Sequence, residues 1–98
     1  MKQTRKRRIL IMDDSEMNRE ILTGILEDEY DIVEAEDGKK AIAIMEEGLY
    51  SFSIVLLDIT MPELDGFGVL QVMQQRNWLK ELPVIIISAE TSNEYIGH

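Results

Sequence analysis

Cysteine is absent from the 98-residue sequence, histidine occurs once, and no apolar run approaches the roughly 18 residues that a membrane-spanning helix needs. The absence of cysteine excludes disulfides, iron–sulfur clusters and thiolate zinc sites. The single histidine, His98, gives no basis for a histidine-based triad or a histidine metal cage. No apolar segment of signal-peptide length follows the start MKQTRKRR, so we do not expect secretion. A content of 45% hydrophobic and 30% charged residues is typical of one soluble globular domain.

Positive charge is also scarce beyond the N-terminus. Nineteen acidic residues against ten basic ones give a net charge of −9, and five of the ten basic residues lie within residues 1–8. From residue 9 to residue 98, five basic residues stand against nineteen acidic ones, a net charge of −14. Such a body repels nucleic-acid phosphates and attracts cations, so we expect it to bind neither nucleic acid nor membrane directly. Residues 1–8 form a basic arm that suits either contact, but a solubilising leader is the simpler interpretation.

Three short apolar runs have the length of β-strands: Ile9–Met12, Ile54–Leu57 and Val84–Ile87. Unbroken apolar runs are typical of strands that are buried on both faces, as in a parallel sheet. A fourth segment, Tyr30–Ala35, alternates more between polar and apolar residues and is interpreted as an edge strand. The chain therefore predicts four strands separated by longer connections.

Those connections carry helical patterns. Apolar residues recur at helical spacing in three groups: Met17, Ile21, Leu22, Ile25 and Leu26; Ala41, Ile42 and Met45; and Phe67, Leu70 and Met73. Ser15 suits the N-cap of the first helix, and Gly48 is a fitting end for the second, which we expect over residues 39–47. Residues 91–98 resemble the start of a further helix. Alternation of strands and helices indicates an α/β open sheet with right-handed crossovers.

Polar side chains follow the apolar strands at the points where the strands end: Asp13, Asp14, Asp58 and Ser88. In an open parallel sheet these ends share one edge, where ligands bind. Three carboxylates in one pocket repel each other unless a cation lies between them. Hard oxygen ligands favour Mg²⁺, with Ca²⁺ or Mn²⁺ as alternatives. Taken singly, Asp13 and Asp14 also fit a helix cap and Asp58 a turn, but their shared position at strand ends favours a site.

From residue 9 to its end, the sequence resembles the receiver domain of two-component response regulators. The residues that carry the resemblance are Ile11-Met12-Asp13-Asp14-Ser15, Ala35-Glu36-Asp37-Gly38, Ala41, Val55-Leu56-Leu57-Asp58-Ile59-Thr60-Met61-Pro62, Asp65-Gly66 and Ile85-Ile86-Ile87-Ser88-Ala89. No single segment is specific for the family, but the combination is.

The resemblance implies a flavodoxin-like open parallel sheet with strand order 2-1-3-4 and a role in signalling. In this family an aspartate at the position of Asp58 accepts a phosphoryl group from a phosphohistidine. The implied partner is therefore a sensor histidine kinase or a phosphotransfer protein, in a cytoplasmic and bacterial setting. The implied ligands of Mg²⁺ are Asp13, Asp14, Asp58 and the backbone carbonyl of Thr60. The Ser88 hydroxyl and the Ala89 amide would contact the new phosphate.

The family's pattern continues beyond the match with a helix, a fifth strand, a final helix and a lysine that contacts the phosphoryl group. We therefore expect residues 9–98 to form an incomplete receiver domain. With strand order 2-1-3-4, the first helix covers strands 1 and 2 and leaves its side of strands 3 and 4 bare. An open apolar edge at strand 4 invites pairing. We predict that the chain hides this surface by self-association, by exchange of segments between copies, or by binding a missing C-terminal piece.

Two other functions stay open at this point. One is a phosphorylation-incompetent receiver fragment that acts as an assembly module and does not respond to Mg²⁺. The other is a Mg²⁺-dependent phosphohydrolase with an aspartate nucleophile. Such enzymes usually carry Asp-x-Asp after the first strand, whereas Asp13 and Asp14 are adjacent and the better nucleophile, Asp58, follows another strand. We therefore expect a phospho-accepting switch and not a turnover enzyme, capable at most of self-phosphorylation and autodephosphorylation.

Overall fold

The computed structural model describes residues 7–58 and 66–87 of the chain. Within these residues, strands and helices alternate as the sequence predicts. The elements are β1 (Arg7–Met12), α1 (Glu16–Leu26), β2 (Tyr30–Ala35), α2 (Gly38–Gly48), η1 (Leu49–Ser51), β3 (Ile54–Asp58), α3 (Gly66–Gln75), η2 (Trp78–Lys80) and β4 (Val84–Ile87). The helix expected from residue 91 lies outside the described residues. No helix in the described part of the chain is long and apolar enough to cross a membrane.

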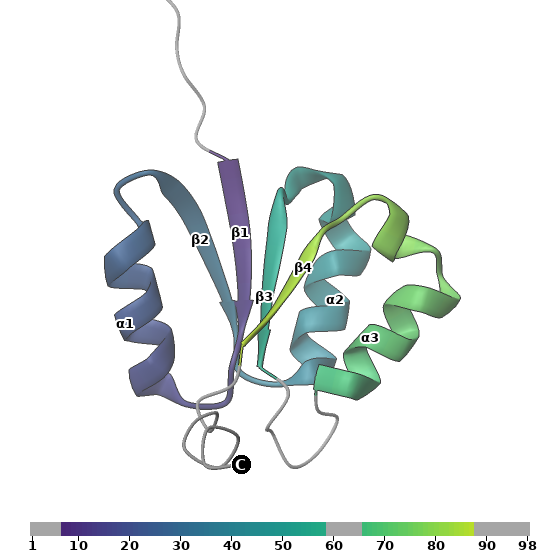
Figure 1. Ribbon diagram of the computed structural model, residues 1–98, viewed down its shortest axis with the longest axis horizontal. Coiled ribbons are helices and arrows are strands. Elements are labelled where there is room, and N and C mark those ends of the chain that lie inside the picture. Colours follow the sequence, from purple (N-terminus) through teal and green to yellow (C-terminus); the bar gives the residue numbers. More distant parts are fainter. Residues whose placement is uncertain (1–6, 59–65, 88–98) are drawn as a thin grey trace, which may run out of the picture.

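The strands form one parallel sheet in the order β2-β1-β3-β4, which confirms the predicted order and the flavodoxin-like fold. Helix α1 lies on one face of the sheet, and α2 and α3 lie on the other (Figure 1). This arrangement brings the carboxyl ends of all four strands to one edge of the sheet.

Each face of the sheet carries its own apolar core. The larger core lies under α2 and α3 and consists of the buried residues Leu10, Met12, Ala35, Ala41, Met45, Phe52, Val55, Leu57, Val69, Met73 and Leu82. The smaller core lies on the α1 side, where Ile9, Ile11 and Leu56 pack with partly buried residues that include Leu22 and Leu26. Burial on both faces explains why the central strands are unbroken apolar runs.

The two longest helices begin with side-chain caps. The Ser15 hydroxyl accepts a hydrogen bond from the Asn18 backbone N–H at 3.2 Å, which confirms the predicted N-cap of α1. The Asp37 carboxylate accepts one from the Lys40 backbone N–H at 2.8 Å and caps α2. Both caps satisfy N–H groups that have no partner within the helix, and both lie at the edge where the strands end.

Strand β1 begins two residues earlier than the apolar run suggests. Arg7 and Arg8 pair in register with Tyr30 and Asp31 on β2. The Arg8 guanidinium also donates to the Ser51 hydroxyl at 2.9 Å and lies 4.8 Å from the centre of the Phe52 ring. Arg7 and Arg8, the last two residues of the predicted basic arm, therefore belong to the sheet. Main-chain pairing allows this because it does not depend on side-chain polarity.

Phe67 was predicted to lie on the apolar face of α3, and this prediction is wrong. Val69 and Met73 are buried, whereas Phe67 has an exposed fraction of 59%. A residue two positions before Val69 on an α-helix points roughly 200° away from it, so the face that buries Val69 and Met73 turns Phe67 outward.

The α1 side of the sheet is only partly covered. Along α1, Leu22 and Leu26 face the smaller core, whereas Met17, Ile21 and Ile25 lie on the outer surface. The prediction of a bare surface is right for β4, where Ile85 is 49% exposed, and wrong for β3, where Leu56 is 9% exposed. Leu56 is buried because it packs with Ile9 and Ile11 in the smaller core.

Candidate functional site

Three carboxylates meet where β1 and β3 end. Met12 on β1 pairs with Leu57 on β3, so the residues that follow them, Asp13 and Asp58, lie side by side. Carboxylate oxygens of Asp13, Asp14 and Asp58 all lie within 4.8 Å of one another. The exposed fraction is only 3% for Asp13 and 2% for Asp58, while Asp14 is exposed. The sequence-predicted carboxylates therefore form one cluster that is open to solvent on the Asp14 side.

The donor set fits a hard divalent cation. Oxygen ligands on opposite sides of one ion lie about 4 Å apart around Mg²⁺ and about 5 Å apart around Ca²⁺, given their metal–oxygen distances. The spacing in the cluster is within 4.8 Å, so the three residues can share one ion of this kind. All three residues offer carboxylate oxygens. Mg²⁺, Ca²⁺ and Mn²⁺ prefer such oxygen ligands, whereas softer metals prefer thiolate ligands.

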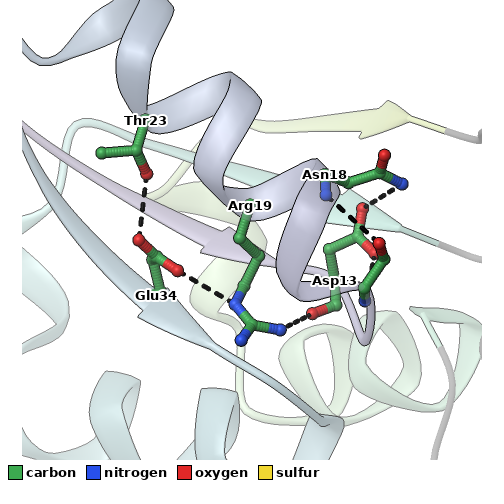
Figure 2. Close-up of polar contacts among 6 residues, drawn as sticks. Asp13, Asn18, Arg19, Thr23 and Glu34 are labelled. Atoms are coloured by element: carbon green, nitrogen blue, oxygen red, sulfur yellow. Dashed lines mark hydrogen bonds and ion pairs between the residues drawn. The ribbon is translucent and has the colours of Figure 1, made fainter.

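Asp13 is held on all sides by its neighbours. Its backbone N–H donates to the Ala35 carbonyl on β2 at 3.1 Å. One carboxylate oxygen accepts from the Ser15 backbone N–H at 2.9 Å, and the other lies 3.5 Å from the Asn18 side-chain amide. Figure 2 shows the Asn18 side chain above the Asp13 carboxylate at the start of α1. The first turn of α1 and the end of β2 thus fix the orientation of this carboxylate.

A second set of contacts reaches the Asp13 main chain from α1. The Arg19 guanidinium donates from Nη1 to the Asp13 carbonyl at 2.7 Å and from Nε to Glu34 Oε1 at 2.9 Å. The other Glu34 oxygen accepts from the Thr23 hydroxyl at 3.0 Å. These contacts form a continuous line from α1 through β2 to Asp13 (Figure 2). Arg19, Thr23 and Glu34 are not among the site residues predicted from the sequence, although Arg19 and Thr23 are four residues apart and share a helix face.

The electrostatics of the cluster favour a bound cation. Burial raises the pKa of Asp13 above its ordinary value, and the negative charge of Asp58 adds to the increase. The hydrogen bond from the Ser15 backbone acts in the opposite direction but does not cancel the increase. Two buried carboxylates that repel each other in this way are stabilised in their charged forms when a positive ion lies between them.

The remaining predicted site residues, Thr60, Ser88 and Ala89, lie outside the described residues. Asp58 pairs in register with Ile87, the last residue of β4, so β4 ends beside Asp58. The predicted roles of Thr60, Ser88 and Ala89 stay predictions.

Comparison with known proteins agrees with this architecture. The response regulator receiver domain family matches residues 9–98. A two-component response regulator of Oryza sativa is 31% identical over 91% of this chain and 66% of its own length. Among solved structures, the chemotaxis protein CheY4 of Vibrio cholerae has a TM-score of 0.78 and 26% identity, covering 95% of this chain and 77% of that one.

A third similar protein carries ligands relevant to the site. A response regulator of Thermotoga maritima, solved in complex with Mg²⁺ and BeF, has a TM-score of 0.76 and 32% identity, covering 87% of this chain and 71% of that one. The chain spans just under two thirds of the length of the rice relative, at 66%. The match over residues 9–98, the sheet order and the similar structures lead to one conclusion. The chain belongs to the receiver domain family of two-component response regulators.

Proposed function

We propose that this domain accepts a phosphoryl group on Asp58 from a phosphohistidine of a sensor kinase or phosphotransfer protein, in a reaction that needs Mg²⁺. The observation that carries the proposal is the meeting of the Asp13, Asp14 and Asp58 carboxylates within 4.8 Å at the ends of β1 and β3. Membership of the receiver family supports it, as does the similarity to a regulator solved with Mg²⁺ and BeF.

Asp58 suits the role of acceptor because its backbone is fixed. It is the last residue of β3, a strand paired on both sides, and it is 2% exposed. In the proposed step a carboxylate oxygen of Asp58 bonds to phosphorus while the bond from phosphorus to the imidazole nitrogen breaks. The phosphoryl group passes to Asp58 as an acyl phosphate, and the imidazole keeps the bonding electron pair.

Asp13 and Asp14 are proposed to bind the Mg²⁺ ion that neutralises charge in that step. Mg²⁺ bound by Asp13, Asp14 and Asp58 would neutralise the negative charge that otherwise keeps a carboxylate from an anionic phosphoryl group. The Asp13 carboxylate is held by the Ser15 backbone N–H, whereas Asp14 is exposed to solvent. The proposal also keeps the carbonyl of Thr60 as a ligand, and the Ser88 hydroxyl and Ala89 amide as contacts of the phosphate.

The domain is proposed to act as a signalling switch, with self-phosphorylation and autodephosphorylation as its only chemistry. Adjacent acids at Asp13 and Asp14 leave no second aspartate two positions from the first, which disfavours a phosphohydrolase. We place the reaction in the cytoplasm, where a kinase and its phosphodonor meet. A bacterial source stays a prediction, since the curated relative reported above is from rice.

A second candidate function is assembly. Ile85 and Ile86 on β4 are 49% and 48% exposed, and β4 is the outer strand on its side of the described sheet. Exposed apolar residues on an outer strand favour pairing with another chain or segment. We therefore propose self-association or segment exchange through β4 as an accompanying property of the chain, and as its main property if Asp58 accepts no phosphoryl group.

Intact-mass spectrometry after incubation with acetyl phosphate tests the proposal. The wild-type chain should gain one phosphoryl group in the presence of Mg²⁺ and none after chelation, and Asp58→Asn should gain none. Asp37→Asn is the matched control, because Asp37 lies at the same edge of the sheet but caps α2. An adduct that persists in Asp58→Asn, or its absence from folded wild-type protein, contradicts the proposal. Steady hydrolysis of small phosphate esters would favour the phosphohydrolase instead.

A further inference from the structure

We propose that Arg19 is a positioning residue for the carboxylate cluster. It acts by fixing the main chain at Asp13, with Glu34 and Thr23 fixing Arg19 in turn. The inference rests on the proposed function only for the identity of the bound ion. The claim that Arg19 positions Asp13 concerns the chain alone and can be tested without metal.

The amide, the carboxylate and the carbonyl of Asp13 all have hydrogen-bond partners. Its amide is bound to β2 through the Ala35 carbonyl, and its carboxylate is bound to the Ser15 amide. The Asp13 carbonyl is the remaining polar group of the residue, and Arg19 Nη1 donates to it at 2.7 Å. Because this carbonyl belongs to the peptide that leads into Asp14, the contact also constrains the start of the next cluster residue.

The Arg19 side chain is itself held by its contacts. Its side chain is 13% exposed, and its Nε is paired with Glu34 Oε1 at 2.9 Å. Thr23 donates to the second Glu34 oxygen, so both oxygens of Glu34 have partners. A planar guanidinium presents Nε and Nη1 at a fixed spacing, and one side chain can therefore bridge Glu34 and the Asp13 carbonyl. A lysine ammonium at the end of a flexible stem cannot reproduce that bridge.

The positive charge of Arg19 is balanced by an ion pair. Arg19 is the sole basic residue of α1 and lies beside a cluster of three carboxylates, yet its partner Glu34 supplies a compensating negative charge. The guanidinium is directed at a carbonyl and not at a carboxylate oxygen of the cluster. Arg19 thus orders the site without taking the place of a metal ion.

The chain offers a matched control for this arrangement. Arg76 also forms an ion pair with a glutamate, Glu46, but both side chains are about half exposed, at 45% and 49%. Arg76 lies just beyond α3, and its guanidinium lies over the Trp78 ring, 5.0 Å from its centre. Loss of either arginine removes one positive charge and one ion pair. Loss of the Arg19 charge beside the carboxylates would by itself favour cation binding, so weaker Mg²⁺ binding in the Arg19 variant indicates positioning and not charge.

The experiment compares Arg19→Met, Arg19→Lys and Arg76→Met with the wild type. Titration calorimetry with MgCl₂ measures ion affinity, and amide hydrogen exchange in metal-free buffer measures the order of Asp13 and Ser15. Arg19→Met should weaken Mg²⁺ binding about tenfold or more, as does loss of partners that orient metal ligands elsewhere. It should also speed exchange at Asp13 and Ser15 more than at buried amides of α2. Arg76→Met should match the wild type in both measurements.

Arg19→Lys separates positioning from a general effect on α1. It keeps the charge and helical propensity and should recover much of any lost thermal stability, but not the Mg²⁺ affinity. If Arg19→Met is too unstable to study, Thr23→Val removes only the outer hydroxyl and should shift both measurements in the same direction by less.

The outcomes distinguish this proposal from the proposed function. Unchanged Mg²⁺ affinity and unchanged exchange at Asp13 in a folded Arg19 variant overturn the positioning role. If the wild type itself binds no Mg²⁺, the proposed function fails, and the metal-free exchange decides the role of Arg19 alone. In that case selective acceleration at Asp13 and Ser15 supports the positioning role, and equal exchange overturns it.

Discussion

Leu56 and Ile85 are register partners on β3 and β4 and face the same side of the sheet, yet Leu56 is 9% exposed and Ile85 49%. The difference arises because Leu56 packs with Ile9 and Ile11, while Ile85 lies one strand further from that core. At this register the boundary between buried and exposed apolar surface runs between β3 and β4, whereas Ile87, two residues further along β4, packs against the smaller core.

The exposed half of Ile85 predicts concentration-dependent self-association. Replacing it with lysine should lower the association constant by about tenfold or more, because a charge on an outer strand opposes edge pairing. Light scattering and sedimentation over a wide concentration range measure the effect. Leu79→Lys is the control, since Leu79 is 39% exposed in η2, away from this face, and makes the same change in net charge. A wild type that stays monomeric at high concentration would contradict the prediction.

Mg²⁺ should stabilise the folded chain beyond any effect of salt. An ion that binds only the folded state adds about 2.7 kcal/mol to the free energy of unfolding at one hundred times its dissociation constant. The net charge of −9 means that any salt relieves some repulsion, so the comparison needs NaCl buffers of matched ionic strength. Thermal or urea unfolding measures the gain. The gain should disappear in Asp58→Asn and persist in Asp37→Asn, and an equal gain from NaCl would argue against a specific site.

The sequence was sufficient to predict the sheet and the carboxylate cluster. Unbroken apolar runs marked the central strands, and Asp13 and Asp58 follow two of these runs directly. Once those strands are neighbours in a parallel sheet, the meeting of the two aspartates follows from topology alone. The bare apolar surface on β4 was predictable in the same way, because strand order determines which strand lies at an edge.

Contacts that depend on side-chain direction were not predictable. The Arg19 bridge needs the height of α1 above β2 and the conformation of a long side chain, neither of which a periodic pattern contains. The burial of Val69 in place of Phe67 depends on how α3 is rotated about its axis. Both are apolar residues at plausible helical spacing, so composition does not distinguish them. Pairing of Arg7 with Tyr30 was likewise hidden by the charge of Arg7.

Leu57 on β3 and Ile86 on β4 test how unequally these two strands are packed on the same face of the sheet. They are register partners on the α2 and α3 face, with Leu57 fully buried and Ile86 48% exposed. Leu57→Ala should cost about 2–5 kcal/mol of unfolding free energy, and Ile86→Ala about 1 kcal/mol, since half of its side chain already contacts water. Urea unfolding at low protein concentration measures both. Equal costs would show that Ile86 is covered in solution.

We predict that the buried charge of Asp13 lowers the free energy of unfolding in metal-free buffer as the pH rises. Burial and the charge of Asp58 raise its pKa above the ordinary value of 3.8, so the folded chain holds the proton more tightly than the unfolded chain. The contribution to stability is then fully present below pH 3.8 and is lost as the pH rises through the folded-state pKa. Asp13→Asn carries no charge at any pH. It should therefore be more stable than the wild type at neutral pH without metal, and the difference should vanish in acid.

Unfolding curves measured with chelator between pH 3 and pH 8 provide the comparison. Asp31→Asn is the control, because Asp31 is an exposed aspartate on β2 and its removal changes the net charge equally. Adding Mg²⁺ at neutral pH should make the wild type more stable than Asp13→Asn. The ion stabilises the wild type, whereas Asp13→Asn has one carboxylate ligand fewer. A variant that is less stable than the wild type without metal at neutral pH would show that the hydrogen bonds to Asp13 outweigh the cost of burying its charge.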